Sequence, residues 1–213
     1  ATYRGHMCGS MGTINAFSFY GNKIITTGEG GIVCTSDDRL AESARALKDL
    51  SHSPKQRFLH ERIGYNYRMT NMQAALGLGQ LEHLAEFLNT KKHMADLYNQ
   101  RLKKVPGLRL PITKEYAHNV YWMYAVLVED AFGMSRDALH EKLREKGIDT
   151  RDFFLPCHSQ PAVFQKHPTQ EQFPMTENIA KRGLYLPSGL AITDVQINQV
   201  CDALADIASH TSA

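Results

Sequence analysis

Two short apolar runs, residues 14–20 and 31–35, form the first regular pattern along the chain. Both are rich in β-branched and aromatic residues, which favour strands. The turn between them is rich in glycine and small polar residues and carries one lysine, Lys23. The pattern therefore predicts two strands joined by a loop that presents Lys23. Residues 1–12 show no periodicity, which indicates a surface connection.

Helical spacing of apolar residues begins after these strands. Ser36 or Asp37 is a suitable cap for a helix that ends near Asp49. The mixed charge and the proline within residues 51–62 indicate a loop.

The apolar pattern over residues 70–104 is unusually long for one helix. Gly77 and Gly79 are poor helix formers, so we expect either close backbone packing or a bend there. A break near residues 89–90 is a further alternative. Thr70 is a candidate cap for the start of this helix.

The rest of the chain alternates strand and helix patterns, which is typical of a small α+β domain with helices on one face of a sheet. We expect the long helix to link this domain, residues 76–213, to a first domain in residues 1–75. The expected elements are a strand over 121–129, a helix capped by Ser135 and closed by Gly147, a strand over 148–154, a loop over 156–174, a helix from Thr176 to Gly183, a strand over 184–186 and a last helix opened by a Thr193–Gln196 capping box.

Composition is ordinary for a globular protein, with 43% hydrophobic and 22% charged residues. The net charge of +2 does not favour a nucleic-acid or anionic-membrane partner. No apolar run is long enough to span a membrane, and no signal pattern is present. The cysteines form no Cys-x-x-Cys pair and the histidines no ligand-spaced cluster, so we expect a cytoplasmic protein with reduced thiols and no metal site.

Lys23 is the candidate catalytic residue. Desolvation beside apolar side chains favours the neutral, nucleophilic amine of a lysine. Such an amine forms a Schiff base with a carbonyl, either of a substrate or of pyridoxal phosphate (PLP). Ser18, on the incoming strand, is placed to offer a hydroxyl to a phosphate. The alternative is a hairpin with a solvated loop lysine and a serine that binds a neighbouring backbone group.

Seven motifs are spread over nearly the full chain. They are FSFYGNKIITTGEGGIVCT at residues 17–35, GYNYRM at 64–69, QAALG at 73–77, NVYWMY at 119–124, GIDTR at 147–151, FFLP at 153–156 and LYLPS at 184–188. On these motifs the chain resembles the DegT/DnrJ/EryC1/StrS sugar-nucleotide aminotransferases. The resemblance implies the aspartate aminotransferase fold type, an α/β fold in which a partial large PLP-binding domain precedes a small α+β C-terminal domain.

The resemblance also implies roles for single residues. Lys23 matches the lysine that holds PLP and moves a proton during amino transfer; in a dehydratase branch of the family this lysine is histidine, so Lys23 argues for transamination. Ser18 matches a phosphate-binding serine. Asn66 matches an asparagine that reaches the PLP phosphate of the neighbouring subunit, which implies a homodimer with a shared active site.

For the substrate, the chain most resembles the branch that aminates GDP-4-keto-6-deoxymannose, with glutamate as the amino donor. Arg151 and His158 lie where the resemblance places nucleotide-sugar contacts, and an arginine fork suits a pyrophosphate. Two alternatives stay open. The first concerns the substrate, which in this alternative is a dTDP- or UDP-linked ketosugar. The second concerns Arg151, which in this alternative is a surface ion-pair partner next to the core residues Phe153 and Phe154.

One departure from the family bears on activity. Family members carry a large N-terminal segment with an aspartate that pairs with the pyridine nitrogen of PLP, and this sequence starts after the place of that motif. We therefore expect a fragment of a longer protein or the product of a split gene. The alternative from a different class is a catalytically inactive fragment that acts only as an interaction module.

Overall fold

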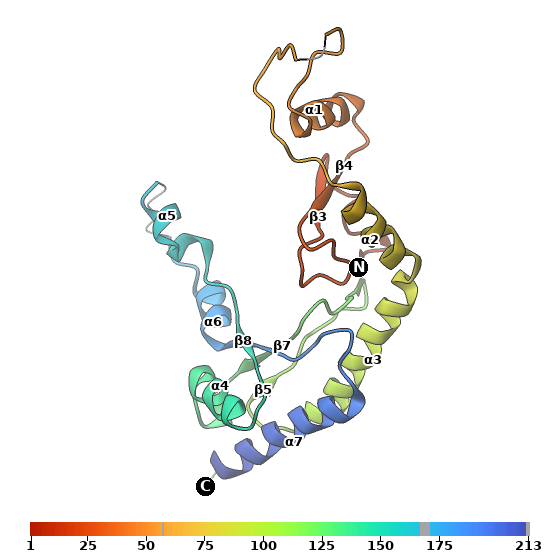
Figure 1. The fold of residues 1–213 in the computed structure, drawn as a ribbon. Coiled ribbons are helices and arrows are strands. Elements are labelled where there is room, and N and C mark those ends of the chain that lie inside the picture. Colours follow the sequence, from red (N-terminus) through yellow and green to blue (C-terminus); the bar gives the residue numbers. More distant parts are fainter. Residues whose placement is uncertain (57, 167–170, 212–213) are drawn as a thin grey trace. The chain divides into compact units, whose positions relative to one another are not determined.

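The structure, a computed structural model, describes residues 1–56, 58–166 and 171–211 (Figure 1). It divides into two compact units. Unit 1 comprises Ala1–Leu88 and Thr113–Val120, and unit 2 comprises Asn89–Ile112 and Tyr121–Ala213. The expected domain division after residue 75 stays a prediction.

Unit 1 contains two small antiparallel sheets and helices. Its elements are β1 (Thr2–Tyr3), β2 (His6–Met7), β3 (Asn15–Ser18), β4 (Gly31–Cys34), α1 (Asp38–Lys48), α2 (Asn71–Glu82), the start of α3 (Leu84–Leu102) and β6 (Ala117–His118). One sheet has the order β2-β1-β6, and the other is the pair β3-β4.

The predicted hairpin is confirmed, because β3 and β4 pair from Asn15 opposite Cys34 to Ser18 opposite Gly31. Residues 1–12 are mostly exposed, as predicted for a surface connection, but they also form the short strands β1 and β2, which were not predicted. Thr2 pairs with both Met7 and His118, and the second partner is too distant in sequence for a local pattern to reveal it.

Capping residues define where the helices of unit 1 begin and end. Asp37 caps α1 by accepting hydrogen bonds from the backbone N of Arg39 at 2.9 Å and of Leu40 at 3.2 Å. Thr70 and Gln73 form a capping box at the start of α2. The long helical pattern is broken at His83, the C-cap of α2, and not at residues 89–90.

Unit 2 is an antiparallel sheet with helices. The sheet has the order β5-β7-β9-β8. Its elements are the rest of α3, β5 (Leu108–Arg109), β7 (Tyr124–Val128), η1 (Asp130–Phe132), α4 (Arg136–Glu145), β8 (Arg151–Asp152), η2 (Cys157–Ser159), α5 (Pro161–Phe164), α6 (Pro174–Arg182), β9 (Gly183–Leu186) and α7 (Asp194–Thr211).

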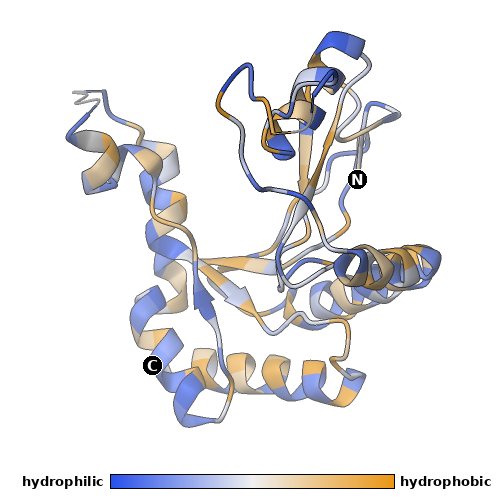
Figure 2. Ribbon diagram, turned by 45° about the horizontal axis from the view of Figure 1, so that its top comes forward, coloured by the Kyte–Doolittle hydropathy of each residue, from blue (hydrophilic) through white to orange (hydrophobic). Residues whose placement is uncertain are grey.

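The core of unit 2 is formed by the apolar faces of these helices and strands. Alternate β7 residues, Tyr124, Val126 and Val128, are buried. The stripe predicted for the last helix is buried as well: Ile197, Val200, Cys201, Leu204 and Ile207. Helices α3 and α7 carry buried apolar residues on one face, and hydrophobic and hydrophilic residues are mixed along the helices of the ribbon (Figure 2).

Caps predicted in unit 2 are confirmed. Ser135 accepts from the backbone N of Ala138 at 3.2 Å, and Gly147, with φ of 76°, follows the end of α4. Thr193 and Gln196 form the expected reciprocal pair at the start of α7. These signals act within one helical turn, which explains why the sequence alone reveals them.

Several element bounds in unit 2 differ from the prediction. β7 starts at Tyr124 because Tyr121 has a φ of 48°, which is incompatible with a strand. The strand expected over residues 148–154 is only Arg151–Asp152. α6 begins at Pro174, whose fixed φ suits the first helical position. The loop expected over 156–174 contains η2 and α5, and its residues 167–170 lie outside the described part.

Among the described residues, no helix combines the length and the apolar character that crossing a membrane requires.

Candidate functional site

Lys23 lies in the loop over residues 19–30, which joins β3 to β4. The backbone N of Phe19 donates to the Gly30 carbonyl at 2.9 Å, and that of Thr27 donates to the Phe19 carbonyl at 2.9 Å. Gly28 and Gly30 have φ of 79° and 138°, conformations that side chains disfavour. The loop is therefore an ordered continuation of the hairpin, and the Lys23 side chain in it is half-buried.

Ser18 and Lys23 are joined through Tyr20. The Ser18 hydroxyl oxygen accepts from the backbone N of Tyr20 at 3.2 Å. The Tyr20 carbonyl accepts from the backbone N of Lys23 at 3.0 Å. The structure thus brings the backbone of Lys23 and the hydroxyl of Ser18 to the same end of the hairpin. Ser18 does bind a neighbouring backbone group, as in the alternative interpretation, and its own hydroxyl hydrogen is a separate donor.

Asn66 lies in an extended segment that pairs with the end of α1. It forms a β-bridge with Asp49, and the rings of Tyr65 and Tyr67 stack at 5.3 Å. Because successive side chains of an extended segment point to opposite sides, Asn66 faces away from the two tyrosines. Its side chain is exposed, and its predicted role in a neighbouring subunit stays a prediction.

A hollow of about 990 Å³ lies within unit 1, and sequence reasoning missed it because its walls come from separate elements. Arg45, Lys48 and Arg68 give it positive charge, although Arg68 is paired with Asp49 at 2.9 Å. The lining also contains residues of β4, α1 and α2 and the stacked tyrosines, but not Ser18, Lys23 or Asn66.

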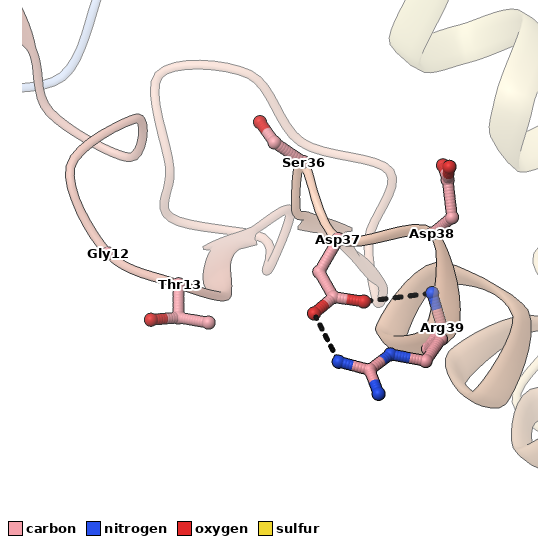
Figure 3. A pocket seen from close by; sticks show the side chains of 6 residues that line it. All are labelled: Gly12, Thr13, Ser36, Asp37, Asp38 and Arg39. Atoms are coloured by element: carbon pink, nitrogen blue, oxygen red, sulfur yellow. Dashed lines mark hydrogen bonds and ion pairs between the residues drawn. The ribbon is translucent and has the colours of Figure 1, made fainter.

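A smaller hollow of about 540 Å³ lies at the start of α1 (Figure 3). Asp37 and Asp38 make its wall acidic, and the Asp37 carboxylate turns toward its own helix and toward Arg39, 3.8 Å away. Two carboxylates repel an anionic group, so this hollow is a poor site for a phosphate.

Arg151 lies in β8 of unit 2, opposite Tyr185 of β9, and is exposed. The Phe153 ring stacks on Tyr185 with centroids 4.5 Å apart. Phe154 is 71% exposed, so the interpretation of this residue as core is wrong. Among the described residues no ion pair of Arg151 is found, which leaves its guanidinium available to a ligand.

His158 lies in η2, and its side chain is 21% exposed. Its Nε2 is 3.1 Å from Glu177 Oε1, and its ring centroid is 4.7 Å from that of Phe173. The described contacts of His158 do not include Arg151. Within residues 1–56, 58–166 and 171–211, no group of three histidine, cysteine or acidic side chains is arranged as a metal site.

Lys91 of α3 is a second unusual lysine, which the sequence analysis did not single out. Its residue is 2% exposed, and Nζ donates to the Trp122 carbonyl at 2.9 Å and to the Ser188 carbonyl. Burial lowers its pKa to about 8. Its position on the stripe with Met94 and Tyr98 was a usable signal, since helical spacing places it on the buried face.

Comparison with known proteins gives one consistent result. The model of the DegT/DnrJ/EryC1/StrS aminotransferase family matches residues 1–205. GDP-perosamine synthase of Caulobacter vibrioides is 38% identical over 211 residues, covering 97% of this chain and 56% of that protein. A putative pyridoxal phosphate-dependent aminotransferase, EpsN, of Bacillus subtilis is 33% identical, with coverages of 95% and 52%.

A solved structure agrees with this result. The crystal structure of the aminotransferase TlmJ from Streptoalloteichus hindustanus matches with a TM-score of 0.90 and 29% identity, covering 100% of this chain and 56% of that one. The fold class expected from the sequence is confirmed. The chain spans about half the length of the relatives it matches.

Proposed function

Because the chain belongs to the DegT/DnrJ/EryC1/StrS aminotransferase family, we propose that it is part of a PLP-dependent enzyme that transfers an amino group to a nucleotide-linked 4-keto-6-deoxy sugar. This family uses PLP. The observation that carries the proposal is the ordered loop that presents Lys23 at the same end of the hairpin as Ser18.

The donor set at this end of the hairpin fits PLP. The cofactor has an aldehyde and a phosphate, and the chain offers the amine of Lys23 and the hydroxyl of Ser18, whose backbone segments are linked through Tyr20. Bound PLP supplies an electron-withdrawing ring that stabilises negative charge at the carbon next to the reacting nitrogen. Lys23 would hold the cofactor and would take up and return a proton, and the Ser18 hydroxyl would donate to the phosphate. The aspartate for the pyridine nitrogen stays a prediction about the longer protein.

The proposed substrate is GDP-4-keto-6-deoxymannose, which would be converted to GDP-perosamine with glutamate as the amino donor. The 38% identity to a GDP-perosamine synthase supports this choice. Arg151, exposed at the sheet edge, and His158 are the proposed nucleotide-sugar contacts. In a homodimer, Asn66 would complete the phosphate site of the other subunit. An identity of this size also fits a dTDP- or UDP-linked ketosugar.

A second candidate, an interaction module without activity, is favoured by one observation. Ile32 and Val33 of β4 are 48% and 53% exposed. A strand with exposed apolar side chains is suited to association with further polypeptide.

Release of 2-oxoglutarate separates these candidates. The chain is incubated with PLP, glutamate and, in turn, GDP-, dTDP- and UDP-linked 4-keto-6-deoxy sugars. We expect release with the wild type, none above background with Lys23→Ala, and unchanged release with Lys142→Ala, which removes an exposed lysine of α4. Equal release from both variants contradicts the proposal, and absence of release from the wild type favours the interaction module.

A further inference from the structure

The loop that carries Lys23 is held at Thr26. The Thr26 hydroxyl donates to the Phe19 carbonyl at 3.0 Å and accepts from the backbone N of Gly28 at 3.0 Å. Thr26 thus joins both sides of the loop. A contact that holds the backbone of Thr26 therefore holds the whole loop.

Gln80 of α2 makes that contact with both ends of its side-chain amide. Its Oε1 accepts from the backbone N of Thr26 at 3.0 Å, and its Nε2 donates to the Thr26 carbonyl at 2.7 Å. Nε2 also donates to the Leu76 carbonyl at 2.9 Å, which fixes the side chain on its own helix. The amide binds Thr26 as a neighbouring strand would, and only a side chain with both a donor and an acceptor does this.

The same face of α2 also contacts Thr27 and Glu29 of the loop. Gln73 Nε2 donates to the Glu29 carbonyl at 3.2 Å. Thr27 is 5% exposed, and a Cβ on Gly77 would lie 3.0 Å from its methyl carbon. Gln73, Gly77 and Gln80 have helical spacing, so they share one face. Of the two alternatives for Gly77, close packing is the one observed.

We propose that Gln80 is a positioning residue, which acts on Lys23 by holding its loop against α2. The inference rests on the proposed function in that Lys23 carries the cofactor. A lysine that must attach PLP, leave it and return a proton has to keep its amine within reach of the same atoms throughout. Small displacements of such a group are costly to rate. The family resemblance assigns no role to Gln80.

The test compares Gln80→Leu and Gln80→Glu with Gln100→Leu, which removes an exposed glutamine of α3. Gln80→Glu keeps the length and one acceptor but has no N–H to donate. Hydrogen exchange of the full chain is measured at the amides of Phe19, Thr26 and Thr27. Competitive acetylation compares Lys23 with Lys142 over a range of pH values.

We expect exchange at all three amides to be about tenfold faster or more in both Gln80 variants, because Gln80→Leu loses both hydrogen bonds to Thr26 and Gln80→Glu loses the one donated to the Thr26 carbonyl. Acetylation of Lys23 relative to Lys142 should rise severalfold, while Gln100→Leu matches the wild type. Amides of α7 serve as an internal control that unit 2 stays folded.

Faster exchange at Thr26 alone would overturn the proposal, since Gln80 would then satisfy one amide without holding the loop. Released amides with unchanged acetylation of Lys23 would also overturn it, because the role would be structural only. Neither measurement uses PLP. Failure of the wild type to trap PLP at Lys23 would therefore contradict the proposed function and leave these two results to decide on Gln80.

Discussion

In unit 2, helices and sheet share an apolar core, whereas the described part of unit 1 is held mainly by polar contacts. Every buried apolar side chain of the described residues lies in unit 2. In unit 1, the buried residues are Thr27, Ser51 and Ser53.

The candidate PLP-binding residues and the buried apolar core therefore lie in different units of this chain. Lys23, Ser18 and Asn66 belong to unit 1, where order comes from backbone pairing and from side-chain hydrogen bonds such as those of Gln80. Hydrogen bonds add less stability than burial of whole apolar side chains. In unit 1 of this chain we therefore expect local order to depend on single polar residues such as Gln80.

The two unusual lysines show the same contrast. Lys91 in unit 2 is enclosed and donates to two carbonyls. Lys23 in unit 1 is half-buried and lies in a loop. Lys91 is thus held by the contacts of the core, whereas Lys23, the proposed PLP lysine, lies in a loop.

The largest expected effect comes from the core of unit 2. Leu204 is 0% exposed, so Leu204→Ala should lower the free energy of unfolding by about 2–5 kcal/mol. Denaturant unfolding followed by Trp122 fluorescence measures it. Val195→Ala, at a residue 66% exposed on the same helix, should change stability by about 0.5 kcal/mol or less. Equal losses from both variants would contradict the placement of the core.

The second prediction concerns pH. The pKa of Lys91 is lowered to about 8 in the folded chain, from 10.5. Between these values the unfolded chain binds more protons, so this group makes the folded state more stable as pH rises through the window. Between pH 8 and 10.5, the free energy of unfolding of the wild type should rise by roughly 1–3 kcal/mol relative to that of Lys91→Met.

The measured quantity is the difference between the two proteins at each pH. Burial raises the pKa of the Cys201 thiol to about 11, which acts in the opposite direction in both proteins and cancels. A difference that stays flat with pH would mean that Lys91 is not desolvated in solution.

A smaller effect tests the packing of the Lys23 loop on α2. A side chain at Gly77 meets Thr27, whereas nothing lies within 4 Å of a Cβ at Gly79. Gly77→Val should therefore speed hydrogen exchange in residues 19–30, and Gly79→Val should not, although valine has the same helix propensity in both. Equal exchange in both variants would contradict this packing.

Several features formed by residues close together in the sequence were predicted, whereas several contacts between distant segments were not. The caps at Ser135 and at Thr193 were predicted because their partners lie within one turn. The pairing of β1 with β6 and the contact of Gln80 with Thr26 were missed because they join distant segments. The break at His83 was misplaced, since neither glycine nor proline marks it. Lys23 was found from the motif around it, and its role stays a prediction.

The most direct test of the central claim is to add PLP to the purified chain, reduce with borohydride and map the modified peptides by mass. We expect the cofactor on Lys23 well above the level on exposed lysines such as Lys142, with no adduct at that position in Lys23→Arg. An even distribution over the exposed lysines would contradict the assignment of Lys23 as the lysine that carries PLP.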